Sequence, residues 1–206
     1  MRPLRFVHRF VGASALVLAA SSAEAGPVSG VIRTAVAPGA RAAIAVVYAE
    51  PVDTAAPRRP GRFTLRQKHK TFQPSVLAIP VGSTVDFPND DAIFHNVFSM
   101  SDAKEFDLGY YKKEKVPEVR FDRVGRVDVF CAIHPKMHCI ILVVPNPFFA
   151  VADDKGRFVI KDVPAGTYKV RAWHERIPSQ TREIVVPATG DVKIDFTLGL
   201  GELPKY

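Results

Sequence analysis

Short apolar and β-branched runs, each broken after a few residues by proline, glycine or a polar turn, dominate the hydrophobic pattern of this chain. Within 126–131, for example, Val127, Val129 and Cys131 occupy every second position. Because successive side chains of a strand point to opposite faces, this alternation predicts a strand with one buried face. The 17 Pro and 13 Gly in 206 residues favour many short strands over long helices. We therefore expect an all-β fold.

The same pattern predicts strands along the whole chain, with turns at 37–40, 80–83 and 122–125. The predicted strands are 28–33, 42–50, 75–79, 84–87, 97–98, 116–121, 126–131, 140–144, 149–152, 158–160, 168–173, 182–186 and 192–198. Four Pro or Gly residues interrupt 51–61, which indicates a linker. The pattern thus predicts two groups of strands on either side of a break.

The first 25 residues have the composition of a secretory signal peptide. Three arginines form a basic region, 10–20 is apolar, and Ala23-Glu24-Ala25 supplies small residues at the cleavage positions. A membrane anchor is the alternative, but this apolar run is shorter than the roughly 20 residues of a spanning helix. We expect export, cleavage and no membrane span in the mature protein, which would then lie in an oxidising compartment such as a bacterial periplasm.

The charge balance excludes one class of partner. The chain has 28 Lys or Arg and 21 Asp or Glu; removal of 1–25 takes away three Arg and one Glu, which leaves 25 and 20, a net charge of +5. This excess is modest, and the chain contains no long basic run with interleaved aromatic residues, so we expect no nucleic acid partner. The densest basic cluster, 110–115, is interpreted as a solvated loop that can steer an acidic protein partner.

One stretch, Cys131-Ala132-Ile133-His134-Pro135-Lys136-Met137, carries the most distinctive chemistry of the chain. It places a thiolate, an imidazole and a thioether within seven residues, at the tip of a predicted hairpin. An upstream His-Asn pair adds a second imidazole. Soft sulfur with borderline nitrogen donors suits copper in both oxidation states better than any hard cation. We expect one copper ion in a closed trigonal site with a weaker axial thioether, its ligands being His95, Cys131, His134 and Met137.

Two segments resemble the ligand segments of the cupredoxins, the type 1 (blue) copper proteins. The run 85–97 is similar to the first, in which a His-Asn pair follows a strand and an Asn-rich turn, and C-x-x-H-x-x-M resembles the short loop of the amicyanin and plastocyanin type. The resemblance covers 63–145 and implies a Greek-key β-sandwich. It also implies three equatorial ligands with Met137 axial, and Asn96 bracing the cysteine loop. The whole chain also resembles proteins labelled methylamine-utilisation-like.

A second cysteine leaves an alternative open. Cys139 lies across the hairpin base from Cys131, and two cysteines in an exported protein first suggest a disulfide. Such a bond would remove the copper thiolate, and it would leave the placement of the histidines and Met137 unexplained. We favour Cys139 as a small buried apolar residue at the start of a core strand. His138 is an alternative axial ligand, although we favour a solvent-facing loop histidine.

The C-terminal part has a different pattern. The run 153–168 resembles the D-x-x-G-x-F-x-I-x-x-V/L-P-x-G-x-Y pattern of carboxypeptidase-regulatory-like, transthyretin-like sandwiches, whose first strands have counterparts before the linker. We therefore expect a copper domain inserted into a split sandwich; two tandem domains are the alternative. The predicted parts are the signal peptide 1–25, N-terminal strands 26–50, linker 51–62, copper domain 63–145 and second sandwich 146–206.

Function follows from the predicted site. A buried copper ion with four protein ligands has no open position for a substrate, so it suits single-electron transfer rather than an enzyme. The resemblance places the electron port at the exposed edge of His134. We expect periplasmic redox partners such as a cytochrome c or a dehydrogenase. Copper handling without redox traffic is the alternative, but the chain has only 3 Met and no Met/His-rich tract. A multicopper enzyme would need additional histidine clusters, and only five of the 6 His remain after removal of 1–25, two of them already used as ligands.

Overall fold

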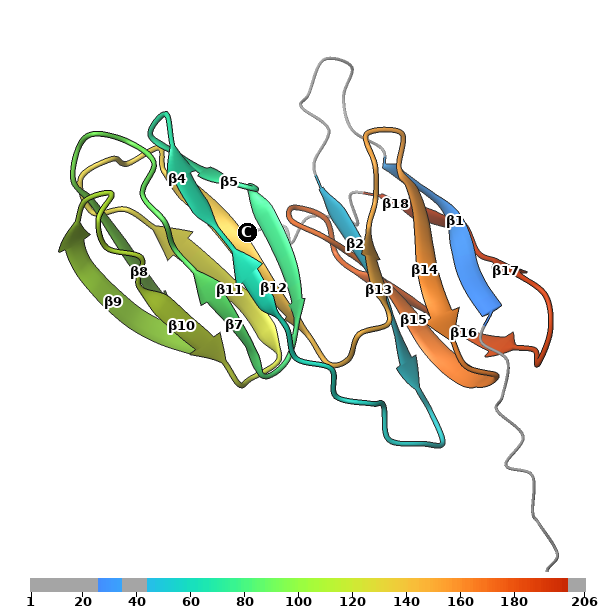
Figure 1. Cartoon of the computed structure of the whole chain (residues 1–206). Helices are drawn as coiled ribbons and strands as arrows, with labels where there is room; N and C mark the ends of the chain where they lie inside the picture. Colours follow the sequence, from blue (N-terminus) through green and yellow to red (C-terminus); the bar gives the residue numbers. More distant parts are fainter. Residues whose placement is uncertain (1–25, 35–43, 200–206) are drawn as a thin grey trace, which may run out of the picture.

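Two β-sandwiches make up the described part of the chain. The structure is a computed structural model that describes residues 26–34 and 44–199 (Figure 1). These residues form 18 strands and no helix, which confirms the all-β prediction. Within them no apolar helix reaches the length needed to cross a membrane. The predicted signal peptide 1–25 and the predicted turn 37–40 lie outside the described residues.

The first sandwich packs a five-stranded sheet against a three-stranded sheet. The larger sheet has the order β6 (Val76–Pro80), β12 (His138–Val144), β11 (Gly125–Phe130), β8 (His95–Ser101) and β9 (Lys104–Tyr111). The smaller sheet has the order β10 (Glu118–Phe121), β7 (Ser83–Asp86) and β3 (Arg62–Thr64). A separate hairpin joins β4 (Arg66–Lys68) to β5 (Thr71–Gln73). Residues 52–61, which precede β3, form no strand.

Alternating apolar side chains fill the space between these two sheets. Val127 and Val129 of β11 are fully buried, as are Phe87 and Phe121. Burial of each such side chain contributes about 1.5–3 kcal/mol. Cys131, next on the same face after Val129, belongs to this core as well. The predicted alternation along 126–131 is therefore confirmed.

The second sandwich is built from strands on both sides of the first one in the chain. One sheet has the order β14 (Arg157–Val163), β1 (Gly26–Thr34) and β17 (Val192–Lys193), with β18 (Phe196–Leu198) pairing farther along β1. The other has the order β13 (Phe149–Val151), β2 (Ala45–Pro51), β15 (Gly166–His174) and β16 (Gln180–Val186). Ala49 of β2 lies opposite Val170 of β15. A strand that precedes the first sandwich in the chain therefore pairs with a strand that follows it.

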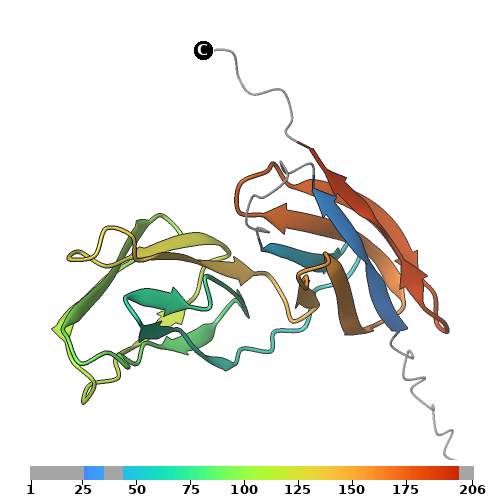
Figure 2. The ribbon, with the colours of Figure 1, turned by 90° about the horizontal axis from the view of Figure 1, so that it is seen from above.

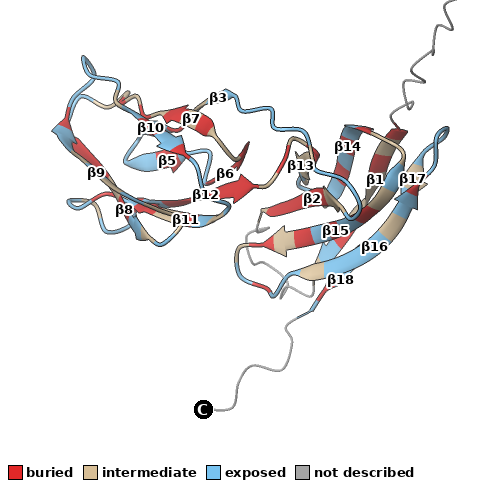
Figure 3. Ribbon diagram, turned by 90° about the horizontal axis from the view of Figure 1, so that it is seen from below, coloured by how far each residue is buried: buried red, intermediate tan, exposed pale blue. Residues whose placement is uncertain are grey.

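The two sandwiches lie side by side (Figure 2). Residues of β2, β6 and β12 form one apolar cluster between them. Along β12, Ile141 and Val143 face the core of the first sandwich, whereas Ile140 and Leu142 belong to a second apolar cluster shared with β2. Both faces of β12 are consequently buried (Figure 3). The guanidinium of Arg126 adds a hydrogen bond of 3.1 Å to a carbonyl of the second sandwich. The strand that follows the predicted ligand loop is thus held between two cores.

Strand β9 was not predicted. The predicted solvated loop 110–115 is wrong at its start, because Tyr110 and Tyr111 belong to β9 and Tyr111 is buried. Tyr111 ends β9 with only 3% of its surface exposed, and its hydroxyl donates to the Phe87 carbonyl at 2.8 Å. Along β9, an edge strand, half-buried Phe106 and Leu108 alternate with exposed Glu105 and Asp107, a strand signal that the prediction did not use. The lysines that follow Tyr111 are exposed, as predicted.

The covered outer face of β12 leads to a test by substitution. We expect Leu142→Asp to lower the free energy of unfolding by at least about 3 kcal/mol, because it removes a buried apolar side chain and places a carboxylate between two cores. Val185→Asp, at a position that is 68% exposed on β16, is the matched control and should change stability by no more than about 0.5 kcal/mol. Urea unfolding measures both; equal losses would contradict a shared cluster.

Candidate metal centre

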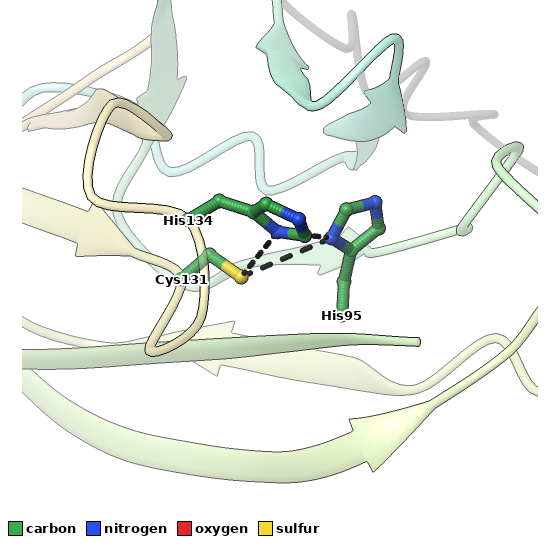
Figure 4. Close-up of side chains that lie close together, drawn as sticks. All are labelled: His95, Cys131 and His134. Atoms are coloured by element: carbon green, nitrogen blue, oxygen red, sulfur yellow. Dashed lines mark hydrogen bonds between the residues drawn. The ribbon is translucent and has the colours of Figure 1, made fainter. Parts of the chain in front are cut away.

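Three side chains that bind metals in many proteins converge at one end of the first sandwich (Figure 4). His95 is the first residue of β8, Cys131 directly follows β11, and His134 lies in the loop before β12. Because β8 and β11 are antiparallel neighbours, the start of one and the end of the other lie at the same end of the sheet. The strand order therefore brings together residues that are 36 positions apart.

The donor atoms of these residues point toward one another. Cys131 Sγ lies 3.8 Å from His95 Nδ1 and 3.6 Å from His134 Nδ1, and the two nitrogens are 3.1 Å apart. Metal–nitrogen distances of about 2.0–2.1 Å and metal–sulfur distances of about 2.3 Å require donors roughly 3.5–3.8 Å apart in a trigonal plane. The sulfur–nitrogen separations match this requirement, and the nitrogen pair is slightly closer. The donor set fits one copper ion.

The centre is closed toward the protein and open only at one histidine. His95 and Cys131 are buried, with 0% and 5% of their surfaces exposed, whereas His134 is half-buried. Burial, the neighbouring His95 and the charge of Lys70 lower the pKa of His134 below its ordinary value. Its imidazole is then neutral at neutral pH, which is the form that binds a metal.

Met137, the fourth predicted ligand, is almost completely buried in the same core cluster as Cys131. Its backbone N–H donates to the carbonyl of His134 at 2.8 Å, and this hydrogen bond closes the loop between the two residues. The structure thus places Met137 at the buried end of the loop. Its role as an axial ligand stays a prediction.

Asn96 occupies the position that the cupredoxin resemblance implies. Its side-chain oxygen accepts a hydrogen bond of 3.3 Å from the backbone N–H of Ala132, directly after Cys131. Its amide nitrogen donates to Asp107 Oδ1 at 2.6 Å. A buried amide with partners on both sides is fixed in orientation. Asn96 therefore ties the cysteine loop to β8 and β9.

Asp91 contacts His95, and the sequence did not predict this contact. In the sequence Asp91 is part of a turn between two strands. Its Oδ2 accepts a hydrogen bond from the Nε2–H of His95 at 2.9 Å. Burial acts to raise the pKa of Asp91, but the backbone N–H of Lys70, the ring of His95 and the N–H of His69 outweigh it and hold that pKa below its ordinary value. The carboxylate is ionised at neutral pH.

The second cysteine is free and has the surroundings of a core residue. Both cysteines are free in the structure, so the alternative disulfide between them is not formed. Cys139 lies opposite Val129 in the β11–β12 ladder and is 1% exposed. Burial, with a smaller effect of Asp128, raises the pKa of Cys139 well above its ordinary value. It remains a neutral thiol, as the sequence predicts.

The remaining described histidines lie outside the centre. His138 is exposed, begins β12 rather than lying in a loop, stacks on Phe130 and bonds Asp128 at 2.8 Å. Because its ring is held by Asp128 outside the cluster, His138 is not favoured as the alternative axial ligand. His69 is exposed in the turn after β4, and His174 ends β15 in the second sandwich. Of the five described histidines, two, His95 and His134, belong to the cluster with Cys131.

Comparison with known proteins gives similar solved structures but no family. No protein-family model matches the chain, and no curated protein sequence matches it significantly. A copper-containing nitrite reductase from Thermus scotoductus SA-01 is 28% identical, with a TM-score of 0.38, over 46% of this chain and 25% of that chain. A purple cupredoxin from Nitrosopumilus maritimus is 25% identical, with a TM-score of 0.36, over 39% of this chain and 98% of that one.

A reduced Cu(I) form of an amicyanin variant is 24% identical, with a TM-score of 0.38, over 45% of this chain and 86% of that chain. Of the nitrite reductase, by contrast, the chain spans only a quarter of the length. At these TM-scores the likeness carries no functional argument. The chemistry of the centre follows from its own side chains, His95, Cys131 and His134.

The brace formed by Asn96 leads to a second test. We expect Asn96→Ala to weaken copper binding about 10–100-fold, because the loop that carries Cys131 loses the hydrogen bond that orients it. Competition with a chromophoric copper chelator measures the affinity. His138→Ala is the control, since that ring bonds Asp128 instead, and it should leave the affinity unchanged. A larger loss in His138→Ala than in Asn96→Ala would contradict this account.

Proposed function

We propose that the chain binds one copper ion through His95, Cys131, His134 and Met137 and carries single electrons between redox proteins. The observation that supports this proposal is the convergence of Cys131 Sγ with the Nδ1 atoms of His95 and His134. Soft sulfur and imidazole nitrogen together suit copper in both oxidation states. Copper bound there would supply one-electron oxidation and reduction.

The surroundings of the ligands favour electron transfer over catalysis on a substrate. The Cys131 side chain belongs to the sandwich core and the His95 ring is fully buried. The Asn96 amide and the hydrogen bond from Met137 fix the ligand loop. Ligands held in one arrangement need little reorganisation when the charge of the ion changes. A fourth ligand from Met137 leaves no position at which a substrate can bind.

The exposed surface around His134 is a suitable electron port. Three apolar side chains flank the two histidines in sequence: Ile93 and Phe94 directly precede His95, and Ile133 directly precedes His134. Their exposed fractions are 40%, 49% and 46%. We define these three residues as the port surface. An apolar contact of this kind lets a partner approach the half-buried imidazole without leaving charges unpaired.

A positive charge excess surrounds the port surface. At this end of the sandwich, the segments 66–70, 88–94 and 111–117 are joined by the Gln67–Asn89 bridge and by hydrogen bonds of Asp91 and Asn89. The segment 131–137 lies beside them, because its His134 contacts His95, the residue that follows 88–94. We consider these four segments together. They contain seven basic residues, Arg66, Lys68, Lys70, Lys112, Lys113, Lys115 and Lys136, against three acidic ones, Asp90, Asp91 and Glu114. We therefore propose an acidic redox partner, such as an acidic cytochrome c or a dehydrogenase, in the periplasm.

The ligand assignment is tested by the two cysteines, which serve as a matched pair. Cu(II) added to residues 26–206 should give an intense thiolate-to-copper absorption band at one copper per chain. Cys131→Ala should abolish this band because it removes the thiolate, whereas Cys139→Ala should keep it because that thiol is a core residue. Loss of the band in both variants would contradict the assignment. A bound copper that cannot be reversibly reduced would favour copper handling instead.

The partner proposal is tested by charge reversal. Lys112, whose Nζ lies 4.6 Å from the Phe94 ring centre, and Lys136 of the ligand loop are both exposed. We expect Lys112→Glu with Lys136→Glu to slow electron transfer to an acidic c-type cytochrome at least about tenfold at low salt, and much less at roughly 1 M salt, because ions screen the attraction.

Lys169→Glu on the second sandwich is the control for this measurement, because the residue is exposed on β15 and lies far from the port in sequence. Stopped-flow kinetics at several ionic strengths gives the bimolecular rate constants. An equal effect of the control substitution, or a faster reaction of the Lys112 and Lys136 double variant, would overturn the proposed acidic partner.

A further inference from the structure

The His95 ring is held between two kinds of groups. Its Nδ1 faces Cys131 and His134, and its Nε2 lies 2.9 Å from Oδ2 of Asp91. An ionised carboxylate can only accept a hydrogen bond, so the ring proton resides on Nε2. The lone pair of Nδ1 is then directed toward the other two donors. This contact selects the tautomer of His95 that can bind a metal at the centre.

Asp91 is itself fixed by a set of hydrogen bonds. Its two carboxylate oxygens accept from the backbone N–H groups of His69 at 2.7 Å and Lys70 at 2.9 Å. Its own N–H donates to the side-chain oxygen of Asn89 at 3.0 Å. The amide nitrogen of Asn89 donates to the carbonyl of Tyr111 at 3.0 Å. The β4–β5 turn, the segment before β8 and the end of β9 therefore all hold this carboxylate in place.

We infer that Asp91 is a positioning residue that lowers the reduction potential of the copper centre, an inference that rests on the proposed function. Its negative charge lies one imidazole ring away from the donor atom of His95, and its carboxylate is only 15% exposed. Limited contact with water leaves that charge weakly screened. A fixed negative charge stabilises Cu(II) more than Cu(I), because the oxidised ion carries one more positive charge. The hydrogen bond also makes His95 a stronger donor.

The neighbouring Asp90 provides a control for nonspecific charge effects. It belongs to the same turn and carries the same charge, but its carboxylate bonds Arg66 at 3.1 Å rather than a histidine. Asp91→Asn removes the charge while keeping an oxygen that can accept from His95 Nε2. Asp91→Ala removes both the charge and the acceptor. Asp90→Asn reports the effect of any lost charge in this turn, Asp91→Asn the effect of the charge beside His95, and Asp91→Ala the added effect of the lost hydrogen bond.

The test is a spectroelectrochemical titration of the copper-loaded full chain and its variants. At a fixed ambient potential, Asp91→Asn should raise the Cu(I)/Cu(II) ratio at least about tenfold, which is about 59 mV for one electron, with the absorption band retained. Asp90→Asn should raise it less than about threefold. An unchanged ratio in Asp91→Asn, or equal shifts in the two Asn variants, would overturn the inference.

A second measurement on the metal-free protein keeps this inference separate from the proposed function. Nitrogen NMR of the His95 ring at pH 8 should report the Nε2–H tautomer in the wild type and in Asp91→Asn, and a mixture of tautomers in Asp91→Ala. The same tautomer in Asp91→Ala as in the wild type would overturn the positioning role. If the wild type gives no thiolate-to-copper band, the proposed function fails, while the NMR result still decides what Asp91 does to His95.

Discussion

The approach of one sulfur and two ring nitrogens to within 4 Å of one another is the interaction on which the proposed activity depends. It arises from strand order, because β11 lies between β8 and β12 and therefore brings the start of β8 next to the loop after β11. His95 and Cys131 are buried, whereas His134 is half-buried, so solvent reaches the donors only from the side of His134. Each further feature of the centre, from Asn96 to Asp91, acts by holding one of these donors.

The second sandwich contributes to this arrangement through β12. The ligand loop ends where β12 begins, and β12 has one face in each apolar cluster. A strand packed on both faces has few alternative positions, because a slip of one residue would exchange its two sets of side chains. The loop between Cys131 and β12 is thus attached at its C-terminal end to a strand in which every residue after His138 is buried. The second sandwich offers structural support at a distance from the port surface.

Local sequence patterns predict the fold class and most of the strands, since alternation and turn residues act over a few positions. The spacing of Cys131 and His134 likewise predicts that they share a loop. The contact between Asp91 and His95 could not be predicted in this way. It depends on the β4–β5 turn, whose N–H groups bind the carboxylate from about 20 positions upstream. Tyr111 was misassigned for a related reason, because its burial depends on Phe87 and not on its own lysine-rich neighbours.

The two cysteines illustrate how the surroundings decide the chemistry of identical side chains. Both are buried, yet they are not partners in the ladder, because the residue opposite Cys139 lies two positions before Cys131. Cys139 lies within the ladder, opposite Val129, where an apolar core keeps its thiol neutral. Cys131 lies just past the end of β11, where the ladder stops and two imidazole nitrogens approach its sulfur. A thiol can serve as a metal ligand only where such donors complete the set, so the end of β11 places Cys131, and not Cys139, where the proposed copper ion would bind.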